Sequence, residues 1–142
     1  MGGIVDCLEF TVESQEDFAD SWLPTLDINI QIDSGNMVNY RFYEKPSISQ
    51  VCLQKGTALS RNSLVQSLSE DTKRRMMNSS SRVPDSERIR VIDKWAQKMI
   101  NSGHGMKEVR SIVISGLKGY YSKLKKCQKT GAPVHRSAKL SF

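Results

Sequence analysis

The chain has 142 residues, of which 38% are hydrophobic and 25% charged, with a formal net charge of +6. This length fits one domain with a modest core. The sequence contains no apolar run near the roughly 18–20 residues that span a bilayer and no signal-peptide pattern at its N-terminus. We therefore expect an intracellular protein, nuclear or cytoplasmic, without a membrane partner.

The charges are divided unevenly along the chain. Residues 1–33 hold eight acidic side chains and no Lys or Arg, whereas all 21 basic residues follow Asn39, where only seven acidic ones remain. After Glu108 every charged side chain is basic. This imbalance is typical of proteins that bind a polyanion. A solvated helical surface with a cationic tail would give the same pattern.

The first 46 residues predict a small antiparallel β element. Residues 4–12 have the alternation of a first strand, and residues 14–21 form an acidic connection. In residues 23–32, Leu and Ile alternate strictly with Asp, Asn and Gln from position 26 onward, which is the period of a half-buried strand.

A hairpin is predicted to follow. The Asp-Ser-Gly-Asn sequence at 33–36 favours a turn, because Gly and Asn tolerate positive φ. Residues 38–42 then resume the alternation, with Tyr40 and Phe42 on the apolar face that we expect to be buried. Pro46 ends the pairing, because it has no N–H to donate.

The amino-acid sequence of this hairpin resembles that of a known protein family. Leu-Pro-Thr-Leu-Asp-Ile at 23–28 and Tyr-Arg-Phe-Tyr-Glu-Lys-Pro at 40–46 resemble a segment of retroelement reverse transcriptases of the Penelope-like and related animal types. The rest of residues 8–124 matches by helix layout. In that family the segment follows the catalytic palm motifs and leads into the thumb. The resemblance implies a fragment with the end of the palm and the thumb, whose partners are a template–primer duplex and a full-length polymerase.

Helical periods replace the strand pattern after a connection at 47–60. The first helix is predicted at 61–77 with Ser60 as its N-cap. Pro84 fits the first turn of a second helix. That helix is expected to bury one apolar stripe, consisting of Ile89, Ile92, Trp95, Ala96, Met99 and Ile100. The fold class is therefore α+β, with a three-helix bundle at 61–126 and a disordered basic tail at 127–142.

The third helix, predicted at 106–126, carries the candidate binding surface. Gly116 lies on its apolar face, where it would allow a close approach of another helix. The opposite face carries the polar and aromatic side chains Lys107, Arg110, Ser111, Lys118, Tyr121 and Lys125. On the hairpin, Arg41 and Tyr43 point away from the apolar face, and we expect both to contact nucleic acid, Tyr43 by stacking on a base.

Catalytic, metal and cofactor sites are not predicted. Reverse transcriptases hold two metal ions with clustered carboxylates, and this sequence has no adjacent pair of aspartates. Its three cysteines and two histidines match no zinc-binding spacing.

Three functions fit these features. The first is thumb-like binding to the backbone of a duplex, an RNA–DNA hybrid or DNA, without reading its sequence. The second is a helix-turn-helix module, because residues 101–105 join two helices closely and Lys107, Arg110 and Ser111 could enter a major groove. The third is a helical protein–protein interaction domain. We take the first as the main hypothesis.

Overall fold

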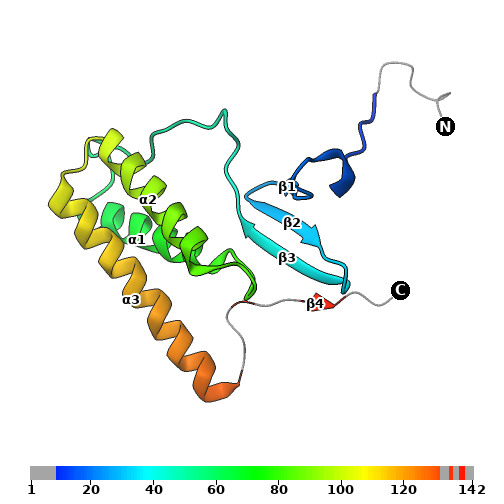
Figure 1. Ribbon diagram of the computed structural model, residues 1–142. Coiled ribbons are helices and arrows are strands. Elements are labelled where there is room, and N and C mark those ends of the chain that lie inside the picture. Colours follow the sequence, from blue (N-terminus) through cyan, green and yellow to red (C-terminus); the bar gives the residue numbers. More distant parts are fainter. Residues whose placement is uncertain (1–8, 132–134, 136–137, 140–142) are drawn as a thin grey trace.

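The computed structural model describes residues 9–131, 135, 138 and 139 and has an α+β fold, in which an antiparallel sheet lies beside three helices (Figure 1). The sheet order is β1-β2-β3-β4, and every neighbouring pair is antiparallel. The elements in chain order are the short 3-10 helix η1 (Gln15–Asp17), β1 (Leu23–Thr25), β2 (Ile28–Ile32), β3 (Met37–Phe42), α1 (Arg61–Met77), α2 (Asp85–Asn101), α3 (Met106–Thr130) and β4 (Ala138–Lys139).

The N-terminal part differs from the prediction in two ways. Residues 9–12 of the predicted first strand have no regular structure, and residues 4–8 lie outside the described residues. The strand predicted at 23–32 is divided, because the chain reverses at Leu26 and Asp27 and pairs β1 with β2. Leu26, which was predicted to face the core, is 94% exposed at φ +42°.

The Gln15 side chain takes the place of the predicted first strand at the edge of the sheet. Its side-chain oxygen accepts the amide of Ile32 at 2.8 Å, and its side-chain nitrogen donates to the Ile32 carbonyl at 3.1 Å. One side-chain amide therefore satisfies the backbone of Ile32 beyond the end of β1, so strand pairing is not needed there.

The hairpin predicted from residues 26–32, the turn at 33–36 and residues 38–42 is confirmed, with its first strand starting at Ile28. The Asp33 carboxylate accepts the amides of Gly35 and Met37, and Asn36 has φ +59°. The hydrogen bond from Met37 is the largest cause that keeps the pKa of Asp33 below its usual value. Ile32 then faces Val38 in the antiparallel register.

The buried side of this hairpin differs from the prediction. The most buried side chains of β2 and β3 are polar, because Asn29 is 8% exposed and Asn39 is 6% exposed. Tyr40 and Phe42, on the predicted apolar face, are only half-buried. The cause lies outside the hairpin: the segment after α1 docks on β3, where Ser80 donates its amide to the Tyr40 carbonyl at 2.8 Å.

The three helices form the main core, as predicted. Ser60 caps α1 by accepting the amide of Ser63. Pro84 is the N-cap residue of α2, one position before the helical residue that it was predicted to be. The central buried side chains are Leu64 and Leu68 from α1, Trp95 and Met99 from α2, and Val109 and Ile112 from α3. A second cluster consists of Met76, Ile92 and Tyr120. These clusters fix which face of each helix points outward.

One detail of the helical prediction is wrong. Ile89, predicted in the core, is 59% exposed, and its neighbour Arg88 is buried. Arg88 can be buried because it donates to Ser79 Oγ, the Ser80 carbonyl and Asp85 Oδ1, which offsets the desolvation of its charge.

The predicted disordered tail is also partly wrong. The helical pattern continues beyond residue 126, and α3 ends only at Thr130, followed by the C-cap residue Gly131 with the left-handed φ of +74°. Ala138 and Lys139 then pair as β4 with Val38 and Met37. The remaining tail positions, 132–134, 136–137 and 140–142, lie outside the described residues.

Gly116 allows α1 and α3 to pack closely. A Cβ at this position would lie 2.5 Å from the Cβ of Thr72 and 2.7 Å from the carbonyl oxygen of Ser69. The close approach expected at Gly116 is therefore confirmed. Among the described residues, no helix is both long and apolar enough to cross a membrane.

Candidate nucleic-acid interface

The outer surface of α3 presents all of the binding residues predicted on this helix. Their side chains are exposed because the opposite side of α3, with Val109, Ile112 and Gly116, packs in the core. We call this surface the α3 face; it consists of Lys107, Arg110, Ser111, Lys118, Tyr121 and Lys125. Its first half lines a shallow groove of about 380 Å³, together with Ile114 and Ser115.

The cations of α3 are distinguished by their lack of ionic partners. The helix carries seven basic side chains, all exposed, and in the part of the chain that the structure describes none of them forms an ion pair. Glu108 is the one acidic residue in the α3 sequence, and it lies 3.9 Å from His104 Nδ1. The α3 face therefore has a positive potential that its own helix does not neutralise.

Most of the basic residues of α1 and α2 have a different environment. Arg74 forms ion pairs with Asp27 and Asp71, and Arg75 with Glu44 and Asp71. On α2, Lys98 forms an ion pair with Glu44. The acids that follow residue 39 in sequence thus gather mainly around the first two helices. Unneutralised positive charge consequently concentrates on α3.

Tyr121 adds an aromatic ring to the α3 face. It is 54% exposed and makes an edge contact with the ring of Tyr120, with centroids 5.2 Å apart. One side of the Tyr121 ring is therefore supported by a buried neighbour while the other side can contact a ligand. Lys118 and Lys125 are three residues before it and four residues after it, which places them on the same side of the helix.

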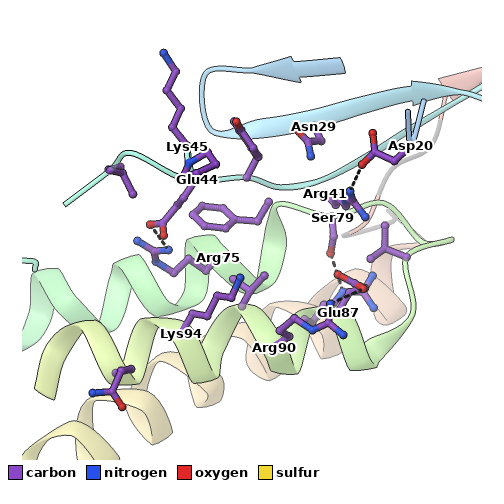
Figure 2. A pocket seen from close by; sticks show the side chains of 18 of the residues that line it. Asp20, Asn29, Arg41, Glu44, Lys45, Arg75, Ser79, Glu87, Arg90 and Lys94 are labelled. Carbon is purple, nitrogen blue, oxygen red and sulfur yellow. Dashed lines mark hydrogen bonds and ion pairs between the residues drawn. The ribbon is translucent and has the colours of Figure 1, made fainter. Parts of the chain in front are cut away.

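Arg41 and Tyr43 lie at a different site. Both line a cleft of about 560 Å³ between β3 and α2, which we call the β3–α2 cleft (Figure 2). The Arg41 guanidinium bonds to Asp20 at 3.3 Å and lies 4.3 Å from the centroid of the Trp22 ring. Within the described residues, these two positions share no cleft with the α3 face. The predicted binding residues therefore form two groups.

The β3–α2 cleft also contains residues that sequence reasoning missed. Arg90 and Lys94 are four residues apart on α2, a spacing that places both on one face of the helix. The sequence spacing alone therefore indicates that Arg90 and Lys94 share a face. The position of this face opposite Asn29 and Tyr43 cannot be predicted from the sequence, since that position depends on how the sheet docks on α2.

A buried ionic cluster closes one end of the cleft. Glu44 accepts hydrogen bonds from Arg75 at 2.8 Å and from Lys98 at 3.0 Å, and both basic side chains are almost fully buried. The Arg75 guanidinium also lies 4.5 Å from the centroid of the Phe42 ring and 4.2 Å from that of Trp95. Burial by itself would raise the pKa of Glu44, but the hydrogen bonds and charges of Lys98 and Arg75 hold this pKa below its usual value.

In the described part of the chain, no three His, Cys, Asp or Glu side chains gather in a way that could hold a metal ion. Cys52 and Cys127 are free thiols, and Cys7 lies outside the described residues.

Comparison with protein-family models, with curated proteins and with solved structures gives no significant match for this chain. The resemblance to retroelement reverse transcriptases therefore depends on the residues at 23–28 and 40–46 and on the order of the helices that follow them.

Proposed function

We propose that this chain is a non-catalytic nucleic-acid-binding segment that holds the backbone of a duplex with the α3 face. The observation that carries the proposal is the row of exposed basic side chains on α3 that have no ionic partner among the described residues. Phosphate groups would supply the missing negative charge. The role corresponds to that of the thumb in the reverse transcriptase family that the sequence resembles.

The spacing of the α3 face suits backbone contacts. Lys107, Lys118 and Lys125 lie along one side of a helix that rises about 1.5 Å per residue, so the row extends over roughly 27 Å. Contacts of Lys and Arg with phosphates position a duplex but carry no sequence information. We therefore propose a binder that treats an RNA–DNA hybrid and unrelated DNA duplexes alike.

A helix-turn-helix module is the second candidate. The observation that favours it is the short connection of four residues, 102–105, between α2 and α3. Lys107, Arg110 and Ser111 then lie at the start of α3, where a recognition helix contacts base edges. This candidate requires a preferred sequence, whereas the thumb-like proposal requires none.

Binding of the purified chain to labelled duplexes between 50 and 200 mM salt tests the proposal. About four neutralised phosphates would give a log–log slope near −3.6, or roughly a hundredfold loss of affinity over this range. A similar slope on every duplex supports the thumb-like role. A preference of more than about tenfold for one duplex would favour the helix-turn-helix candidate. Absence of binding at 50 mM would leave a protein interaction domain, with a full-length polymerase as the partner to test.

A further inference from the structure

Asn29 occupies an unusual position in the wall of the β3–α2 cleft. The residue is 8% exposed, and its Oδ1 atom is shielded from solvent and has no hydrogen-bond partner in the described part of the chain. It lies on the wall that the sheet contributes (Figure 2). Burial of an amide oxygen without a partner destabilises a fold. The residue is therefore poorly explained as a packing element, and a ligand in the cleft would satisfy this oxygen once the side chain rotates toward the cleft.

The opposite wall of the cleft is cationic. Arg90 and Lys94 project from one face of α2 (Figure 2). Lys45 lies on the side of the sheet, in the segment that leaves β3, and its side chain points away from α2 (Figure 2). Arg90 has a partner in Glu87 at 3.5 Å, whereas Lys45 and Lys94 form no ion pair with any described residue. Two of these side chains, Arg90 and Lys94, are close enough in sequence to contact the same anionic group.

An aromatic ring and a suitable volume complete the cleft. Tyr43 is half-buried and lines the cleft together with Asn29. The volume of about 560 Å³ lies within the range of pockets that bind small organic ligands. The cleft thus combines an unsatisfied amide, an aromatic ring and a pair of cations.

We propose that the β3–α2 cleft binds a nucleoside monophosphate unit. The Asn29 amide contacts the base edge, since one asparagine amide matches the neighbouring donor and acceptor of adenine. Tyr43 packs against the base, and Arg90 and Lys94 bind the phosphate. The unit is either a free nucleotide or the unpaired end of a strand. The cleft is separate from the α3 face, so this inference does not depend on duplex binding there.

Isothermal titration of the full chain with AMP, adenosine and inorganic phosphate tests the inference. AMP is expected to bind about tenfold or more tightly than adenosine or phosphate alone, because only AMP engages both walls. Asn29→Leu and the double variant Arg90→Gln/Lys94→Gln should each weaken AMP binding by about tenfold or more. Asn29→Leu should unfold at the same or a higher temperature than the wild type, because it removes an amide whose oxygen has no partner.

The two sources of the nucleotide are distinguished with a blunt DNA hairpin and the same hairpin carrying a short single-stranded adenosine overhang. If AMP does not bind, the inference requires the overhang to raise affinity by about tenfold, and Asn29→Leu must abolish that gain. If Asn29→Leu changes neither the affinity for AMP nor the gain in affinity from the overhang, the inference is overturned. The matched variant Lys118→Gln/Lys125→Gln should weaken blunt-hairpin binding and leave AMP affinity unchanged. Blunt-hairpin affinity thus tests duplex binding at the α3 face, and AMP affinity tests nucleotide binding in the cleft.

Discussion

The indole nitrogen of Trp95 donates a hydrogen bond of 2.9 Å to the hydroxyl of Thr72, which donates in turn to the Leu68 carbonyl at 2.9 Å. This contact joins α2 to α1 at the level where Gly116 of α3 packs against Thr72. The three helices therefore meet around one fully buried threonine. Their meeting point fixes the rotation of α3 and, with it, the outward direction of the α3 face.

Replacing Trp95 with Ala should lower the free energy of unfolding by about 3–5 kcal/mol, because it leaves a cavity in the core and removes the partner of Thr72. Urea unfolding followed by far-UV circular dichroism measures this loss without depending on tryptophan fluorescence. Tyr121→Ala is the matched control on an exposed aromatic residue and should change stability by no more than about 0.5 kcal/mol. A loss below about 1 kcal/mol for Trp95→Ala would contradict the core described above.

Gly116→Ala should destabilise the protein although alanine favours helices. The new Cβ would lie 2.5 Å from the Thr72 side chain and 2.7 Å from the Ser69 carbonyl oxygen, so α1 or α3 must shift. We expect a loss of about 1–3 kcal/mol, the usual range for overpacking.

Gly119→Ala is the control for the effect of helix propensity. Its nearest atom is the flexible Lys73 side chain, 3.3 Å away, which can move. This variant should be neutral or gain up to about 1 kcal/mol. Equal effects of the two substitutions on the unfolding midpoint would show that α1 and α3 do not pack as closely as described.

Glu44→Gln should cost about 3 kcal/mol of stability, because the charges of Arg75 and Lys98 would remain buried with less compensation. Asp85→Asn is the control: Asp85 is 89% exposed at its side chain, and Arg88 keeps its bonds to the two serines. This control should cost no more than about 1 kcal/mol.

The effect of Glu44 should also depend on pH. Its folded pKa is lower than the usual 4.5, so its contribution is present above about pH 4.5 and is lost as the pH falls through the folded value. The difference between the wild type and Glu44→Gln in urea unfolding should therefore shrink below about pH 4.5. A difference that is constant down to pH 3 would rule out the ionic role of Glu44.

His135 should give the fold a second pH dependence. Its Nδ1 atom donates to the Ser79 carbonyl, because a carbonyl can only accept, and Nε2 therefore accepts from the Tyr120 hydroxyl. Burial lowers the pKa of His135 below 6.5, and nearby Arg88 lowers it further.

The folded state therefore binds fewer protons at His135 than the unfolded state does. The stability contributed by His135 is present above about pH 6.5 and is lost as the pH falls through the folded value. Between pH 7.5 and pH 5 the wild type should lose more unfolding free energy than His135→Ala. Parallel losses in the two proteins would show that the contact with Tyr120 and Ser79 does not form in solution.

The helices could be predicted well from sequence because their signals are local. Ser60 and the apolar spacing of residues 64–76 define the start and the buried side of α1 through neighbouring residues alone. Pro84 and the apolar stripe at 92–100 do the same for α2. The exposure of the α3 face follows from the same 3.6-residue period. Ile89 was misplaced because the burial of Arg88 depends on Ser79 and Ser80, which precede α2.

The sheet and the cleft could not be predicted in the same way. Alternation of residues in β2 and β3 identifies two faces, but the docking of Ser80 on Tyr40, forty residues away, decides that Asn29 and Asn39 are the more buried side chains. Leu26 adopts positive φ in the β1–β2 turn without the Gly or Asn that usually marks such a reversal. The β3–α2 cleft, which Ser79 and Val83 help to line, depends on how the segment after α1 docks on the sheet.

The most direct test of the proposed function is the duplex affinity of the Lys107→Glu/Lys118→Glu/Lys125→Glu variant. Its matched control, Lys45→Glu/Arg90→Glu/Lys94→Glu, makes the same change in net charge at the β3–α2 cleft. With the fold of both variants verified by circular dichroism, we predict that the α3 variant loses at least about a hundredfold in affinity for a blunt duplex at 50 mM salt, and that the control loses less than about tenfold. Equal losses in the two variants, or an unchanged affinity of the α3 variant, would contradict the assignment of duplex binding to the α3 face.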